Sequence, residues 1–270
     1  MAIGSLGASS AAGTRSLNTI SRSLTKSLEK LSSGSRIPRA SFDAAGLAVS
    51  ESLKAATASL AQGVRNLNDG ISAARVAEGA LDESSNILGR LRELSIQSQN
   101  GTLNAQQKQT IQQEFDSLTD QVSKIAASTN FNGSKLLDGG SGGNIEVVDG
   151  TGGEAIELAV DDQSASALGV EGLDASDPAS LAKIDQAIRS VSSSRANLGA
   201  SENRISSQIR TQMVAIENTM QANSQIRDAD FASETSELMK NKILRDASLA
   251  VRGQANVGAS VAIKLLGTRG

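Results

Sequence analysis

The chain has 270 residues, a formal net charge of −3 and no His, Cys, Trp or Tyr. Without His or Cys, the sequence excludes a thiolate nucleophile, a Ser-His-Asp triad and the usual zinc ligand sets. A carboxylate-only or Ser-Lys enzyme remains open, but it would need a pocket, and only four Phe are available to help line one. We therefore expect a protein that is not an enzyme and that binds no cofactor and no metal.

Charge is unevenly distributed along the chain. Residues 1–42 carry six Lys or Arg and one Glu, whereas residues 138–177 carry ten acids and no Lys or Arg. The basic residues are spread out without interleaved aromatics, so they predict solvated helix faces and no nucleic-acid binding. No stretch approaches the ~20 apolar residues that span a bilayer, and the N-terminus lacks the apolar region of a Sec signal peptide. Neither membrane insertion nor a cleaved signal is expected.

Two apolar stripes occupy the first hundred residues. The first predicts a helix that ends near Gly34 and Pro38, and it consists of Leu17, Ile20, Leu24, Leu28 and Leu31. The second predicts a helix from about 44 to 99, because apolar residues recur at intervals of seven: Leu53, Leu60, Leu67, Ala74, Leu81 and Leu88. A helix of this length needs partners that cover its stripe.

A third stripe predicts a helix over 104–128 that folds back antiparallel on the second. It follows the breaker Asn100-Gly101, with Asn104 as its N-cap, and consists of Ile111, Phe115, Leu118, Val122 and Ile125. The pattern then changes. A glycine-rich run at 139–143 predicts turns, and the alternating segments 144–149 and 154–160 predict a β-hairpin. Because 138–177 is acidic, we expect this segment to face solvent.

The last hundred residues return to helix. Asp177 and Pro178 predict an N-cap and a first helical position. The helix should run to about 223 or beyond on the heptad residues Ile184, Val191, Leu198 and Ile205. A final helix over about 229–266 has one apolar face, made of Met239, Ile243, Ala250, Val257, Val261 and Leu265.

These elements predict a mainly α fold, a long antiparallel coiled-coil helical bundle with a small β-hairpin insertion. We expect a terminal coiled-coil domain (1–40 with 230–270), a helical bundle domain (41–137 with 178–229) and a surface-exposed acidic hairpin and loop insertion (138–177). The terminal helices carry narrow stripes and no globular core. They are therefore expected to pack on each other and on other copies, and to be unfolded in the monomer.

Seven segments resemble, in order, segments of the bacterial flagellins. They are 31–50 (LSSGSRIPRASFDAAGLAVS), 65–81 (RNLNDGISAARVAEGAL), 90–98 (RLRELSIQS), 131–137 (FNGSKLL), 198–205 (LGASENRI), 226–234 (IRDADFASE) and 254–266, with QAN at its start and LL at its end. A generic coiled coil would share the heptads but not these segments. The large outer variable domains of longer flagellins are missing.

The resemblance implies a structural subunit of the bacterial flagellar filament that polymerises through its N- and C-terminal helices. The implied assembly residues are Leu17, Leu24, Leu28, Leu31, Val257, Val261, Leu265 and Leu266. It also implies an extracellular location in the filament, reached by flagellar type III export without a cleaved signal peptide. The implied partners are further copies of the chain, a flagellar export chaperone, the filament cap and the hook-associated proteins.

The resemblance further implies contact with a host flagellin-sensing Toll-like receptor through Arg90, Leu94 and Glu114. On the sequence alone, Leu94 equally suits bundle packing, and Arg90 with Glu114 more often indicates a solvated pair than a binding site. Two other functions remain open: a hook–filament junction protein of the same fold family, and an intracellular coiled-coil scaffold. Cell fractionation separates the three, because they place the protein in sheared filaments, at the filament base or in the cytosol.

Overall fold

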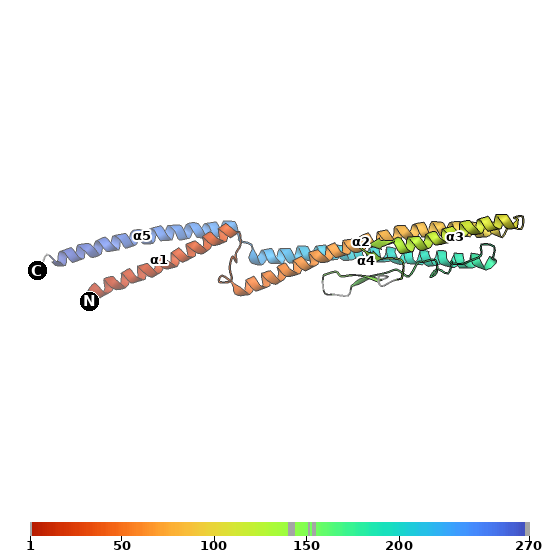
Figure 1. Cartoon of the computed structure of the whole chain (residues 1–270). Coiled ribbons are helices and arrows are strands. Elements are labelled where there is room, and N and C mark those ends of the chain that lie inside the picture. Colours follow the sequence, from red (N-terminus) through yellow and green to blue (C-terminus); the bar gives the residue numbers. More distant parts are fainter. Residues whose placement is uncertain (1, 140–143, 151, 153–154, 268–270) are drawn as a thin grey trace. The chain divides into compact units, whose positions relative to one another are not determined.

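The computed structural model describes the backbone of residues 2–139, 144–150, 152 and 155–267, and the side chains of 13–139, 145–150, 152, 155–258 and 260–261. Most of this chain lies in helices (Figure 1): α1 (Ala2–Ser33), α2 (Ala44–Ser98), α3 (Ala105–Ser128), α4 (Pro178–Arg227) and α5 (Phe231–Gly267). The chain divides into two compact units. We call Met1–Ala55 with Thr219–Gly270 the terminal unit, and Ala56–Asn218 the bundle unit.

Local capping signals start the helices where the sequence predicts. At α3, the Asn104 side chain accepts a hydrogen bond from the Gln107 N–H, and the Gln107 side chain accepts one from the Asn104 N–H. This reciprocal pair is a capping box. At α4, Pro178 is the first helical residue, and Asp177 Oδ1 accepts the N–H of Ala179 at 2.9 Å. The predicted N-caps are therefore confirmed.

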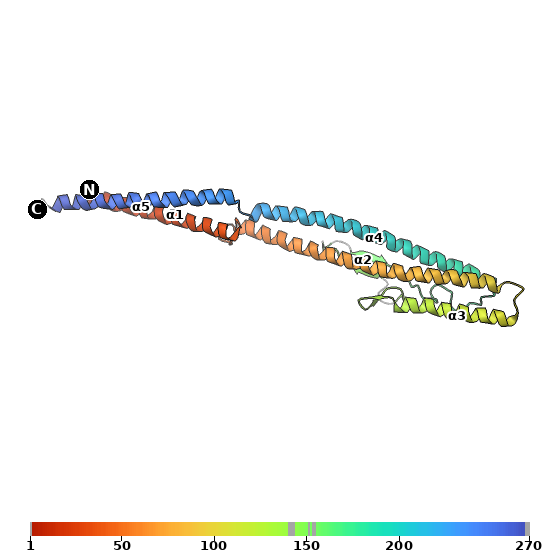
Figure 2. The ribbon, with the colours of Figure 1, turned by 90° about the horizontal axis from the view of Figure 1, so that it is seen from above.

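In the bundle unit, α2 and α4 run antiparallel, as both views of the ribbon show (Figure 1 and Figure 2). Three ion pairs between the two helices show that they run in opposite directions, because the residue numbers of the partners rise along α2 and fall along α4. The pairs join Arg75 to Glu202 at 2.8 Å, Asp82 to Arg195 at 3.0 Å and Arg92 to Asp185 at 2.8 Å. The predicted mainly α fold, with long helices packed against each other, is confirmed.

The core of the bundle unit is built from the predicted heptad residues. From α2 it takes Leu67, Leu81 and Leu88, all fully buried, and it adds two further α2 leucines that lie between heptad positions, Leu91 and Leu94. Helices α3 and α4 contribute Ile111, Phe115, Val122, Ile184, Val191, Leu198 and Ile205. One continuous core therefore joins the three helices.

Two short antiparallel sheets follow α3. Strand β3 (Asn144–Val147) pairs with β4 (Ile156–Ala159), as the sequence predicts. Strands β1 (Asn130–Phe131) and β2 (Ser134–Lys135) form a second, smaller hairpin that was not among the predicted strands. Its turn residues Asn132 and Gly133 both have positive φ, the conformation that two-residue hairpin turns require. Of the predicted glycine-rich run, 140–143 lie outside the described residues.

The expectation that 138–177 faces solvent is wrong for its apolar side chains. Val147 and Leu158 of the hairpin are buried in the same core as the helices. The chain after the hairpin adds six more buried apolar residues, namely Val160, Ala165, Leu168, Val170, Leu173 and Ala175. The charges cluster on the other face, because neighbouring strand residues point to opposite sides of a sheet. An acidic segment can thus cover a core while most of its described carboxylates remain in solvent; the exception is Asp149, which is buried and accepts a hydrogen bond from Gln208 at 2.8 Å.

The end of β3 is fixed against α2 and α4 by a close backbone contact. A Cβ atom built on Gly63 of α2 would lie 1.7 Å from the carbonyl oxygen of Asp149. That carbonyl accepts a hydrogen bond from Nε2 of Gln212 on α4 at 2.5 Å, and the Asn66 amide donates to the carbonyl of Val148 at 3.1 Å. A side chain at position 63 would therefore separate the hairpin from α2.

Candidate functional site

Helices α1 and α5 of the terminal unit lie side by side and form the predicted terminal pair (Figure 1). On α1, Leu17, Leu24 and Leu31 are half-buried, as is Ile20, and Ser27 is buried. These positions step by three and four residues, so they form one heptad seam. An ion pair between Lys30 Nζ and Glu234 Oε1, 2.6 Å long, joins the two helices at their base. The predicted contacts Leu17, Leu24 and Leu31 thus serve the pairing within the chain.

The side of α5 that is least exposed is a polar seam. Its members step by four and three residues, and they are the half-buried Glu234, Leu238, Arg245, Ser248 and Arg252 with the buried Asn241. Only one of these six side chains, that of Leu238, is aliphatic. Apolar periodicity in the sequence does not reveal this seam, because the seam consists mainly of charged, amide and hydroxyl side chains.

The predicted apolar face of α5 points to solvent instead. Met239, Ile243, Val257 and Val261 are 49 to 68% exposed, and Ala250 between them is exposed as well. On α1, the predicted assembly residue Leu28 also lies outside the heptad seam and is 50% exposed. Leu265 and Leu266 are residues of α5, but only their backbone is among the described parts of the chain. We call Met239, Ile243, Val257 and Val261 the α5 stripe.

Backbone hydrogen bonds join the segment that follows α1 to the segment that connects α4 with α5, and they anchor the two terminal helices. Gly34 ends α1 with a φ of 66°, a left-handed conformation that favours glycine. Its carbonyl accepts the N–H of Ala229 at 3.1 Å, and the N–H of Arg36 donates to the carbonyl of Arg227 at 2.6 Å. Ile37 is buried beneath this crossing. The base of the pair is thus fixed, while the described α5 side chains beyond Arg252 are exposed on every face.

Arg90 and Glu114, two of the residues that the resemblance implies for receptor contact, form an exposed ion pair. Arg90 Nη2 lies 3.0 Å from Glu114 Oε1, and its Nη1 lies 3.0 Å from Glu93 Oε2. Hydrogen bonds to Glu114 and then to Glu93 raise the pKa of Arg90. Leu94, the third implied residue, is 1% exposed and belongs to the core. The structure therefore places two of the three side chains on the surface.

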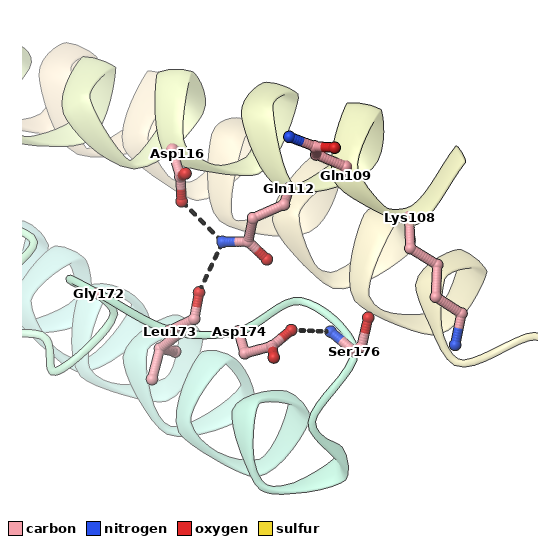
Figure 3. A pocket seen from close by; sticks show the side chains of 8 residues that line it. All are labelled: Lys108, Gln109, Gln112, Asp116, Gly172, Leu173, Asp174 and Ser176. Atoms are coloured by element: carbon pink, nitrogen blue, oxygen red, sulfur yellow. Dashed lines mark hydrogen bonds between the residues drawn. The ribbon is translucent and has the colours of Figure 1, made fainter. Parts of the chain in front are cut away.

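A polar notch of about 560 Å³ lies between α3 and the chain leading to α4 (Figure 3). The Gln112 amide bridges it. Its Nε2 donates to Asp116 at 2.7 Å and to the carbonyl of Leu173 at 2.9 Å, and its Oε1 accepts the N–H of Ala175 at 2.8 Å. The amide thus holds the loop against α3.

Two other kinds of site are absent from the described residues. Within this part of the chain, no helix combines the length and the apolar character that a membrane span requires. The same part contains no group of three or more acidic side chains arranged to hold a metal ion.

Two family models match the chain. Residues 5–141 match the bacterial flagellin N-terminal helical region, and residues 181–266 match the bacterial flagellin C-terminal helical region. Both matches lie on the helices that form the terminal pair and the bundle.

Individual relatives agree with the family models. A flagellin of Halalkalibacterium halodurans is 41% identical over 89% of this chain and 91% of its own. A flagellin of Bacillus subtilis is 38% identical over 93% of this chain and 97% of its own. The crystal structure of Bacillus cereus flagellin superimposes with a TM-score of 0.50 at 32% identity, covering 55% of this chain and 88% of that chain.

Proposed function

Because this chain belongs to the bacterial flagellin family, we propose that the α5 stripe is a surface through which its subunits join in the flagellar filament. Flagellins are structural proteins that polymerise into the extracellular filament, and they are not enzymes. This chain is accordingly a filament subunit that serves motility. The proposal concerns which of its side chains make the subunit contacts.

The observation that carries the proposal is the orientation of α5. This helix directs its polar seam toward α1 and leaves its apolar stripe in solvent. Large apolar side chains that recur in solvent along one helix face are unfavourable in a free subunit and indicate an interaction site. Burial of such side chains against a neighbouring subunit contributes roughly 25 cal/mol per Å² of apolar area. The exposed Leu28 of α1 extends the same function to the other terminal helix.

Alternative functions fit less well. A hook–filament junction protein would share the fold, but the curated relatives quoted above carry the name flagellin. An intracellular coiled-coil scaffold would need a stable pair of helices, yet the terminal pair has a seam interrupted by Asn241, Arg245 and Arg252. Such a seam favours assembly with further copies over a stable isolated pair.

We also propose the route and the transient partners. The chain leaves the cell through the flagellar type III apparatus without cleavage, helped by an export chaperone, and meets the hook-associated proteins and the filament cap during assembly. Support comes from the sparse burial in the terminal unit. Helices with so little buried apolar surface cost little to unfold, which suits transfer through a narrow channel.

Recognition by a flagellin-sensing Toll-like receptor is a second proposal, based on Arg90 and Glu114. Both side chains are 49% exposed and are held together by the ion pair. A positioned arginine on a rigid helix is a frequent anchor of protein interfaces. Leu94 supports this surface from inside the core and does not itself reach solvent.

The α5 stripe is tested by substitution at Ile243. We expect Ile243→Asp to abolish filament growth from purified monomer on seeds, because a carboxylate would be buried at the subunit contact. Circular dichroism of the monomer should stay unchanged, since Ile243 is exposed there. Ile243→Leu keeps the site apolar and is the matched control, which should assemble normally. Normal growth of Ile243→Asp filaments would remove α5 from the interface.

A further inference from the structure

A basic groove lies beside Phe42 in the terminal unit. It measures about 540 Å³ and runs along α1 to the chain that follows α1. Arg22, Lys26 and Arg39 line it, and Glu29, which ion-pairs with Arg39, is its one acid. Lys26 Nζ lies 5.7 Å from the centroid of the Phe42 ring, so a cation–π contact holds the ammonium at the groove. The groove therefore has excess positive charge next to an aromatic ring.

The outer face of the β3–β4 hairpin carries the opposite charge. Glu146 and Glu157 are directly opposite each other in the sheet and both are exposed. Two like charges in this position repel each other. Val148, on the same face, is also exposed, and a hollow of about 240 Å³ beside it contains Asp69 and Phe131. This face thus combines the two hairpin carboxylates with apolar contact surface, and Asp69 of α2 lies in the adjoining hollow.

Apart from the Arg39–Glu29 pair, the charges of these two surfaces have no ion-pair partner among the described side chains of the chain. Across the described side chains, Glu146, Glu157 and Asp69 make no ion pair with Lys or Arg, and Arg22 and Lys26 make none with Asp or Glu. A repulsive carboxylate pair on an exposed sheet face costs stability unless a cation approaches it. A filament supplies such a cation, because it holds many copies of the same chain in contact.

We propose that the outer face of the β3–β4 hairpin of one subunit docks in the basic groove beside Phe42 of a neighbouring subunit. The carboxylates of Glu146 and Glu157 meet Arg22 and Lys26, and Val148 packs toward the Phe42 ring. The inference rests on the filament function, since both surfaces belong to one chain and meet only between copies. It adds a polar contact, made by different residues, to the apolar contact of the α5 stripe.

Charge reversal tests the contact from both sides. The basic-side variant is Arg22→Glu with Lys26→Glu, and the acidic-side variant is Glu146→Lys with Glu157→Lys. The latter keeps a like-charged pair on the hairpin, so its own stability changes little. We expect each variant to raise the critical concentration for seeded growth by about tenfold, the effect of losing 1.4 kcal/mol. The chain that carries all four substitutions should return to near the wild-type value.

A matched control makes the same charge change elsewhere on the chain. Lys183→Glu with Arg189→Glu alters exposed positions of α4 and should assemble like the wild type, and circular dichroism should show every monomer folded. The proposed docking is wrong if the quadruple variant assembles no better than the two double variants. It is also wrong if the α4 control is impaired as much as they are. Normal assembly of all variants would contradict it as well. In each case, the Ile243→Asp result decides independently whether the α5 stripe is a subunit contact.

Discussion

In the bundle unit, α2 alone buries Leu67, Leu81 and Leu88 completely, whereas Ile37 is the one buried apolar side chain among those described in the terminal unit. Both units are built from long helices with heptad spacing. They differ in what the apolar positions contact: three helices and a hairpin in the bundle, and a half-covered seam with an exposed stripe in the terminal pair.

This difference separates folding from assembly. A core that excludes water stabilises a subunit before it meets any other. Apolar side chains that remain in solvent contribute only when a second molecule covers them. The bundle unit is therefore expected to fold alone, and the terminal unit to gain its stability in the filament. Ser27 and Asn241, polar residues buried between α1 and α5, keep the intrachain pairing weak.

The largest contrast should come from truncating one apolar side chain in each unit. We expect Leu88→Ala to lower the free energy of unfolding of the monomer by about 2–5 kcal/mol, because Leu88 is fully buried. Ile243→Ala, at an exposed position, should change it by less than about 0.5 kcal/mol. Urea unfolding followed by circular dichroism measures both. Equal effects would mean that the two units do not differ in this way.

A smaller effect tests whether the hairpin belongs to the bundle. Gly63→Ala should destabilise the monomer by about 1–3 kcal/mol, because the added Cβ overlaps the carbonyl of Asp149. Gly79→Ala is the matched control on the same helix, where a Cβ meets nothing within 4 Å, and it should stabilise by up to about 1 kcal/mol. Equal changes in stability at the two glycines would mean that the hairpin does not pack against α2.

The smallest stability effect is expected at the exposed ion pair of Arg90. A solvent-screened ion pair contributes little to stability, so Arg90→Ala should scarcely move the unfolding midpoint. Receptor activation by the monomer should nevertheless fall by about tenfold, since an arginine anchor contributes strongly to the affinity of an interface. Arg75→Ala removes another exposed pair on α2 and should leave activation unchanged. Superimposable dose–response curves for Arg90→Ala and wild type would exclude Arg90 from the receptor site.

The sequence predicted the elements whose signals are local. Asn104 and Asp177 accept capping hydrogen bonds, so the starts of α3 and α4 could be assigned within one residue. The heptads on α2 and α4 could be assigned because a fully covered stripe must be apolar at every turn. For these parts, local preference and the final fold agree.

Other features depend on tertiary contacts that the pattern of residue types does not contain. The hairpin was expected in solvent because of its net charge, but its charge lies on one face and its apolar residues on the other. On α5 the apolar stripe was found, yet nothing in the sequence says that a polar seam would take the place facing α1. Arg90 and Leu94 are four residues apart on one helix, but one is on the surface and the other in the core.

The most direct test of the account is amide hydrogen exchange, compared between monomer and filament. In the monomer, amides of α2, α3 and α4 should be strongly protected, while those of α1 and α5 should exchange nearly as fast as an unfolded chain. In the filament, α1 and α5 should become as protected as the bundle. If α1 and α5 are already protected in the monomer to the level of α2, the terminal unit folds without assembly and the central claim is contradicted.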